Sequence, residues 1–252
     1  MDKEIFVYNN VEFYAEDGVI LGMHNHSNST VDISIPKEFP QGYILENIPP
    51  YFADGSFGKI ILDDDILSVS SYAFSGSLIE EVVWSKGCRE IPSNCFDHSR
   101  IREITNIDNV EEIGEYAFSC SGLEKMVWPD NCSTISKGCF INSEIKDIQN
   151  IEHVTDIGFG AFAHSKIESL LWPSRCHKIP KFCFSNSNLE EISNIEHVGL
   201  IRGLAFNMCK KLRHIDLSNA ICIIECNAFN GVDPDKIELP YYSNSKILLE
   251  QE

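Results

Sequence analysis

The sequence predicts a right-handed solenoid, a stack of 22-residue coils with a parallel β-sheet on one face and short turns or single helical turns on the other. Phenylalanine recurs at six consecutive intervals of 22 residues and once more after 23. An unbroken isoleucine column follows 17 residues after the Phe, and Ala or Cys precedes each Phe. One such coil cannot bury its apolar face alone, but stacked coils share a continuous core. The phenylalanines are Phe74, Phe96, Phe118, Phe140, Phe162, Phe184, Phe206 and Phe229.

Each coil also carries apolar residues five and eight positions after its Phe, in a short alternating stretch that is typical of a strand. Stacked strands should run parallel, about 4.8 Å apart. The segment 113–118 is too short for a full helix and is expected to form one helical turn on the opposite side. The expected strands are residues 81–84, 103–106, 125–128, 147–150, 169–172 and 191–194.

A second period of 44 residues lies over the first. At one strand position Trp84, Trp128 and Trp172 alternate with Asn106, Asn150 and Asn194. Alternating large and small side chains allow neighbouring coils to interlock. We therefore interpret the tryptophans as core residues rather than parts of a binding site.

The segments 113–118 and 157–162 both read Ile-Gly-x-x-Ala-Phe, and Trp128-Pro129 and Trp172-Pro173 end their predicted strands with proline. Over roughly residues 46–240 the chain resembles the BspA-like leucine-rich repeat family. It departs from that family by placing Cys for Ala in alternate coils and by using coils of 22 rather than 23 residues. The resemblance implies a leucine-rich repeat solenoid, and a role in surface adhesion or protein binding. It carries over no ligand-contacting residue, because the shared motif is a packing motif.

A solenoid needs caps that hide its open core. Residues 1–45 lack the repeat and are expected to form an N-terminal β-rich cap. Residues 46–231 should form about eight coils. Residues 232–252 should supply the last strand and a C-terminal cap, in which Ile247, Leu248 and Leu249 fold over the final coil.

The net charge is −18, from 38 acidic and 20 basic residues. Nucleic acid is therefore not expected as a partner, because its recognition needs a basic surface. No apolar run reaches the ~18 residues that a membrane-spanning helix needs, so no membrane insertion is expected. The first residues lack the basic and apolar regions of a signal peptide.

Six of the ten cysteines fall in two columns, which even coils fill with Val110, Val154, Val198 and with Ala117, Ala161, Ala205. Cysteine here replaces small apolar residues, as buried thiols do. Like positions lie two coils apart, roughly 10 Å, beyond the reach of a disulfide. We expect these six thiols to be reduced and poorly reactive. They are Cys88, Cys95, Cys132, Cys139, Cys176 and Cys183.

No catalytic, cofactor-binding or metal-binding residues are predicted. His153 and His197 lie 44 residues apart at the same position of the repeat, so the repeat itself explains them. Nothing in the sequence places a unique Cys, His and orienting carboxylate together. His24 and His26 could point to one side of a strand, but two ligands are a weak metal signal.

The predicted binding face consists of the outward residues of the strands. If the residues eight and ten after each Phe point inward, those seven and nine after it must point outward. The set is Glu81, Val83, Glu103, Thr105, Lys125, Val127, Asp147, Gln149, Ser169, Leu171, Glu191 and Ser193.

The leading hypothesis is a non-catalytic module that binds a protein carrying basic groups, with a glycan as second choice, along this face. The alternative is an intracellular scaffold or cargo-recognition subunit, which should show a uniformly charged face. An enzyme with a Cys/His site is the third hypothesis. The missing signal peptide and the unpaired core thiols favour the cytoplasm, whereas the family resemblance favours the cell surface or secretion.

Overall fold

The computed structural model describes residues 3–27, 29–218, 220, 222–239 and 247–248, which form two compact units, Met1–Leu123 and Glu124–Glu252. Both are β-solenoids built from coils of about 22 residues, as the sequence predicts. The predicted boundaries at residues 45 and 231 remain predictions.

Unit 1 begins with an antiparallel meander of β1 (Lys3–Tyr8), β2 (Val11–Glu16) and β3 (Val19–His24). The short strand β6 (Ala53–Asp54) extends this sheet in parallel beside β3. A run of alternating buried and half-buried residues in β2 fixes which face of the meander is turned to the core.

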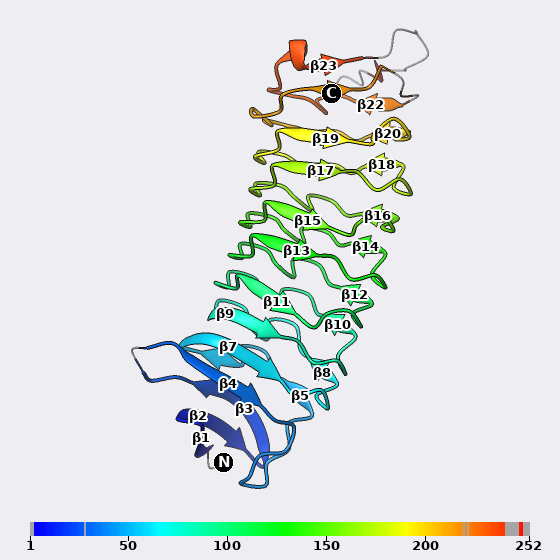
Figure 1. Cartoon of the computed structure of the whole chain (residues 1–252). Coiled ribbons are helices and arrows are strands. Elements are labelled where there is room, and N and C mark those ends of the chain that lie inside the picture. The colour runs from blue at the N-terminus through cyan, green and yellow to red at the C-terminus, as the bar shows by residue number, and fades with distance from the viewer. Residues whose placement is uncertain (1–2, 28, 219, 221, 240–246, 249–252) are drawn as a thin grey trace. The chain divides into compact units, whose positions relative to one another are not determined.

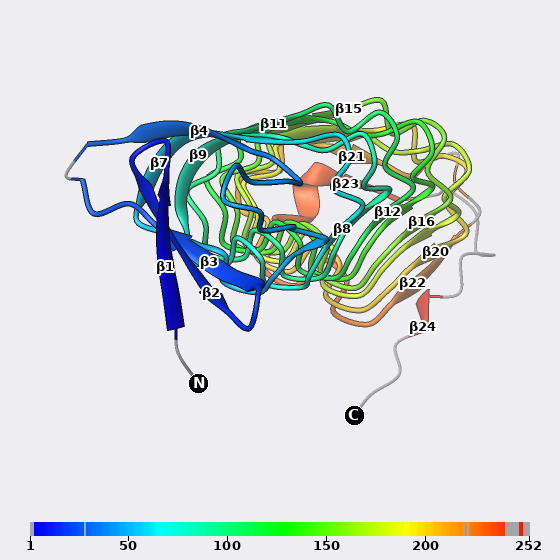
Figure 2. The ribbon, with the colours of Figure 1, turned by 90° about the horizontal axis from the view of Figure 1, so that it is seen from below.

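The repeating part of unit 1 is a parallel sheet in the order β11-β9-β7-β4. Its strands are β4 (Val31–Ile35), β7 (Ser56–Leu62), β9 (Leu78–Val83) and β11 (Glu103–Thr105). Residues 22 apart are paired, for example Ile104 with Val82 and Val82 with Ile60. Figure 2 shows β4, β9 and β11 on one side of the coils, with β8 and β12 on another.

In unit 2 the strand ladders join coils in pairs. β13 (Lys125–Val127) pairs with β15 (Asp147–Gln149), β17 (Ser169–Leu171) with β19 (Glu191–Ser193), and β21 (Ile215–Asp216) with β23 (Ile237–Glu238), all in parallel. Figure 1 shows these strands following one another along unit 2. All six strands expected from the repeat are therefore present.

A second line of two- and three-residue parallel strands was not predicted. In unit 1 it contains β5 (Asn47–Ile48), β8 (Ser68–Val69), β10 (Glu90–Ile91) and β12 (Glu112–Ile113). In unit 2 it contains β14 (Thr134–Ile135), β16 (Asp156–Ile157), β18 (Lys178–Ile179), β20 (Leu200–Ile201), β22 (Ile223–Glu225) and β24 (Ile247–Leu248). The isoleucine column lies in this second line of strands. Isoleucine is β-branched and favours strands, which agrees with its place there.

The expected helical turn at residues 113–118 is wrong in detail, because the segment forms consecutive non-helical turns. Tyr116 has φ 58°, which a right-handed helix does not allow. Alternate amides of each turn donate to the next coil instead, as Phe96 N does to Ala117 O at 2.8 Å. The only helix among the described residues is the 3₁₀ turn Pro234–Lys236.

The Phe column forms the centre of each core. Phe96 stacks on Phe118 in unit 1 with ring centroids 5.4 Å apart, and Phe162 stacks on Phe184 in unit 2 at 5.6 Å. These separations exceed the spacing of about 4.8 Å between neighbouring strands only slightly, so these rings can stack with a small offset. Phe52 and Phe74, at the start of unit 1, instead meet edge to face at 6.4 Å. All three tryptophans are fully buried, in agreement with their interpretation as core residues.

The predicted tail contacts of Leu249 and most of residues 241–252 lie outside the described residues. Within that tail, β24 pairs in parallel with β22, joining Ile224 to Ile247.

Candidate functional site

The strand face of unit 2 presents the outward residues as the alternation predicts. Met126, Ile148, Leu170 and Ile192 are buried, and their neighbours on the strands point to solvent. Val127 is 61% exposed and Leu171 is 52% exposed. Asp147 is half-buried, and the remaining members are exposed, namely Lys125, Gln149, Ser169, Glu191 and Ser193.

The strand face of unit 1 differs from this expectation at Val83, which is half-buried rather than part of an exposed apolar row. Ile61 of β7 is its register partner and is 38% exposed, so the two aliphatic side chains share one patch. Ile61 was not among the predicted outward residues, because that set was drawn only from the six coils that follow Phe74 in strict register. Glu103 is exposed, and Thr105 is half-buried.

Glu81 of this face forms an ion pair with Lys59 of the preceding strand. The carboxylate of Glu81 accepts a hydrogen bond from Lys59 Nζ, which raises the pKa of the ammonium group. In unit 2 Lys146 pairs in the same way with Glu124 at 2.8 Å, and its pKa is raised for the same reason. Lys59 and Lys146 are thus each paired with a carboxylate of the neighbouring coil.

An acidic groove lies at one end of the unit 2 strand face, between β19 and β21. It is lined by Glu190, Glu191, Glu196 and Asp216, together with Arg213, His214 and residues 192–195. One isolated parallel bridge, between Glu191 and His214, joins the two coils at this point. Arg213 forms an ion pair with Glu190. The other three carboxylates of the groove, those of Glu191, Glu196 and Asp216, take no part in that pair.

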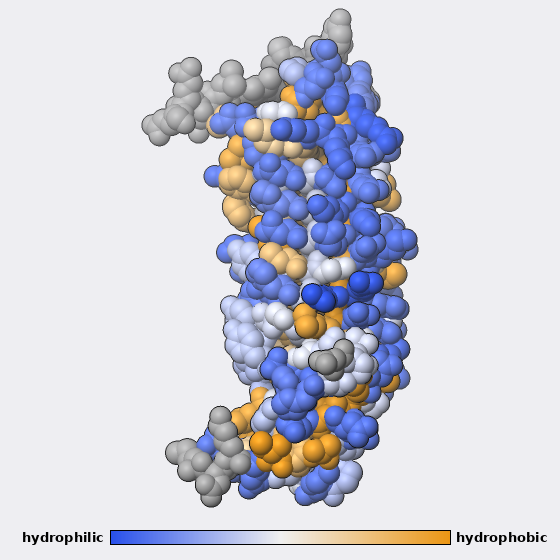
Figure 3. All heavy atoms as spheres, turned by 90° about the vertical axis from the view of Figure 1, so that its left-hand side faces the viewer, coloured by the Kyte–Doolittle hydropathy of each residue, from blue (hydrophilic) through white to orange (hydrophobic). Residues whose placement is uncertain are grey.

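A further hydrophobic surface lies outside the predicted face, on the N-terminal meander of unit 1. Ile5 and Val7 of β1 and Val19 and Leu21 of β3 are exposed. Figure 3 shows hydrophobic atoms gathered at this end of unit 1, while much of the remaining visible surface is hydrophilic.

The six column cysteines are buried core residues, as predicted from their alternation with Val and Ala. Burial raises the pKa of the Cys88 thiol to about 11 and raises those of Cys95 and Cys183 well above their usual range. A thiol held protonated is a poor nucleophile. Their low reactivity and reduced state remain predictions.

The rings of His24 and His26 lie side by side, with centroids 4.0 Å apart, and each contacts a different carboxylate. His24 Nδ1 lies 2.8 Å from Asp54 Oδ2, and His26 Nε2 lies 2.7 Å from Glu12 Oε2. Each histidine is therefore held by its own carboxylate.

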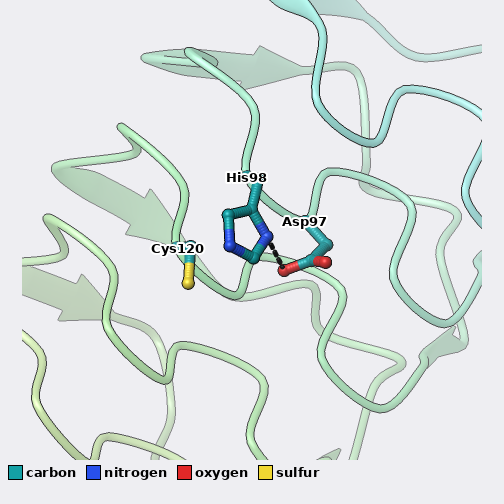
Figure 4. A group of neighbouring side chains, drawn as sticks. All are labelled: Asp97, His98 and Cys120. Carbon is teal, nitrogen blue, oxygen red and sulfur yellow. Dashed lines mark ion pairs between the residues drawn. The ribbon is translucent and has the colours of Figure 1, made fainter.

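The structure does bring one Cys, His and carboxylate together, contrary to the sequence analysis. Asp97, His98 and Cys120 of unit 1 offer three potential ligand atoms within 4.8 Å of one another. Figure 4 shows the His98 ring between the Asp97 carboxylate and the Cys120 sulfur. The sequence concealed this group because Cys120 lies 22 residues beyond His98, and only stacking of the coils makes them neighbours.

The protein belongs to the BspA type leucine rich repeat region family, whose model matches in six copies over residues 47–168 and 135–248. The class of protein is thus a repeat module for interaction or adhesion, and such modules are typically non-enzymatic. Among the described residues no helix is long and apolar enough to cross a membrane.

Particular solved structures of bacterial leucine-rich repeat proteins are similar to this chain at low identity. The pneumococcal vaccine antigen PcpA is 15% identical, with 91% of this chain and 79% of that chain covered and a TM-score of 0.44. A leucine-rich repeat protein of T. pallidum is 18% identical, with coverages of 76% and 82% and a TM-score of 0.45. One from Eubacterium ventriosum is 14% identical, with coverages of 97% and 100% and a TM-score of 0.36. No functionally curated protein matches the chain.

Proposed function

We propose that the protein is a non-catalytic binding module that holds a protein partner on the strand face of unit 2. The observation that carries the proposal is the exposure of Val127 and Leu171, two aliphatic side chains at the same position of alternate coils. A face that served only as a spacer would be expected to carry polar residues there.

The two side chains lie two strand spacings apart, about 10 Å, with Gln149 between them. Full burial of one such aliphatic side chain stabilises a complex by about 1.5–3 kcal/mol. Val127 and Leu171 would thus supply affinity, while the polar rows around them would fix orientation.

Charge favours a partner with basic groups. The chain carries a net charge of −18, and the groove between β19 and β21 lies on the same face of unit 2. Carboxylates at the rim of an interface mainly accelerate association and select against acidic competitors. On unit 1 we include Glu81, Val83, Glu103 and Thr105 in the proposal as a separate contact region.

The second candidate is a scaffold or cargo-recognition subunit in a reducing compartment. The buried thiols of both units favour this location, because unpaired cysteines are common where disulfides do not form. A glycan is the less favoured ligand for the strand face.

A displayed library of random peptides tests the proposal directly. Peptides selected by the wild-type protein should combine Lys or Arg with aliphatic or aromatic residues, and their binding should weaken as salt is added. The double variant Val127→Asp/Leu171→Asp should lose them, because each carboxylate would have to be buried against an apolar side chain.

The matched control is Ser133→Asp/Ser174→Asp, which adds the same charge at exposed loop residues outside the strand face. It should bind the selected peptides as wild type does. Undiminished binding by the double variant would exclude this face as the binding site. If the protein selected no peptides but bound sugars on a glycan array, the ligand would be a glycan and not a protein.

A further inference from the structure

The turn that follows the Phe of each coil stacks equivalent residues of successive coils. His98 and Cys120 both lie two residues after their Phe, in unit 1, and both have left-handed backbone conformation, φ 56° and 51°. Because their backbones are equivalent, their side chains leave the coils in parallel, about one strand spacing apart. Gly76 occupies the same position one coil earlier and adds no side chain.

Backbone bonds on both sides fix this turn. Gly76 N donates to Asp97 O at 2.7 Å, and His98 N donates to Ser119 O at 2.9 Å. Ser99 Oγ closes the turn locally by donating to Phe96 O at 2.7 Å. A backbone held in this way loses little conformational freedom when the side chains that it carries bind a ligand.

We propose that Asp97, His98 and Cys120 form a binding site for zinc. The three side chains offer one carboxylate oxygen, one imidazole nitrogen and one thiolate sulfur, all atoms within 4.8 Å of one another. Zinc bonds of about 2.0–2.3 Å to such atoms, at tetrahedral angles, require separations of roughly 3.5 Å. Side-chain rotations that bring the ligand atoms about 1 Å closer together therefore complete the site. The fourth coordination position of the zinc is left for water.

The chemistry of the ligand set favours zinc over the hard cations. Magnesium and calcium select oxygen ligands, whereas a thiolate with an imidazole and a carboxylate is a set that zinc accepts. Asp97 Oδ1 lies 2.9 Å from His98 Nδ1, so Asp97 can either bind the metal or orient the ring that binds it through Nε2. In both arrangements His98 and Cys120 are direct ligands.

Binding requires the Cys120 thiol to lose its proton. The S–H bond is replaced by a sulfur–zinc bond, and one proton is released to the buffer for each metal bound. Zinc affinity should consequently rise with pH. A nucleophilic role for Cys120 is less well supported, because the His98 side chain is 68% exposed and a water-excluding cleft normally surrounds such a pair.

Cobalt(II) and zinc titrations of the metal-free chain test the proposal. Wild type should bind one cobalt per chain with a thiolate-to-cobalt charge-transfer band, and zinc should displace it. Cys120→Ser should abolish the band, and His98→Ala should weaken zinc binding at least on the order of 10- to 100-fold, as much as the loss of an outer-shell partner does.

Two control variants remove the same residue types, a histidine and a cysteine, at positions outside the proposed zinc site. His164→Ala removes a histidine from the same turn position in unit 2, where φ is 59°, and Cys226→Ser removes another half-buried thiol. Both should bind cobalt as wild type does, and circular dichroism checks that each variant is folded. The proposal is overturned if wild type binds no stoichiometric metal, or if Cys120→Ser leaves the charge-transfer band unchanged.

Discussion

The side chain of Asn194 reaches back one coil and donates from Nδ2 to the backbone carbonyl of Trp172, at 2.6 Å. In return Trp172 N donates to the carbonyl of Ser193 at 2.9 Å. Asn150 is bonded to Trp128 O in the same way at 2.8 Å. Each Asn therefore joins its coil to the preceding Trp coil, which gives the 44-residue period of the sequence a structural basis.

Asn194 should be replaceable by glycine at lower cost than by alanine. Its φ is 61°, a conformation that glycine adopts freely and alanine does not. Asn194→Gly loses one hydrogen bond and should lower the free energy of unfolding by about 1 kcal/mol. Asn194→Ala also strains the backbone and should cost about 2 kcal/mol. Urea unfolding of both variants measures the difference, and equal stabilities would show that the bond alone matters.

The repeat allowed the strands, the Phe stack and the buried cysteines to be predicted, because a fixed period fixes which side chains share a column. The turn at Tyr116 was not predictable, since its left-handed backbone depends on bonds to the neighbouring coil rather than on local sequence. The same reason concealed the group of His98 and Cys120. Strand alternation gives the direction of a side chain such as Val127, but no such rule applies within a left-handed turn.

Trp172 and Trp84 occupy equivalent positions but differ in their hydrogen bonding. Trp172 Nε1 donates to Cys176 O at 2.8 Å, whereas the buried Trp84 Nε1 has no partner among the described residues. Replacement by Phe removes similar volume at both positions. Trp172→Phe should therefore be more destabilising than Trp84→Phe by about 1–3 kcal/mol, the cost of an unpaired buried polar group. Parallel urea titrations test this, and a difference of the opposite sign would contradict it.

Gly158 of the Ile-Gly-x-x-Ala-Phe segment lets two coils approach closely. A Cβ atom at this position would lie 2.4 Å from the backbone nitrogen of Lys137, in the preceding coil of unit 2. Gly158→Ala should thus force the backbones apart and lower the free energy of unfolding by about 1–3 kcal/mol. At Gly199 the nearest atom to such a Cβ is His177 O at 3.8 Å, an ordinary contact. Gly199→Ala is therefore the control and should be neutral or slightly stabilising.

The buried thiols should make the fold sensitive to alkaline pH. Burial raises the pKa of the Cys88 and Cys209 thiols to about 11, from the ordinary thiol value of 9.0. Between about pH 9 and about pH 11 the unfolded chain releases these protons and the folded chain keeps them, so the free energy of unfolding falls as pH rises. Cys88→Val, which introduces the residue that even coils carry at this position, should flatten that decline. Urea unfolding at intervals of pH measures it, and an equally steep decline in the variant would exclude Cys88 as a contributor.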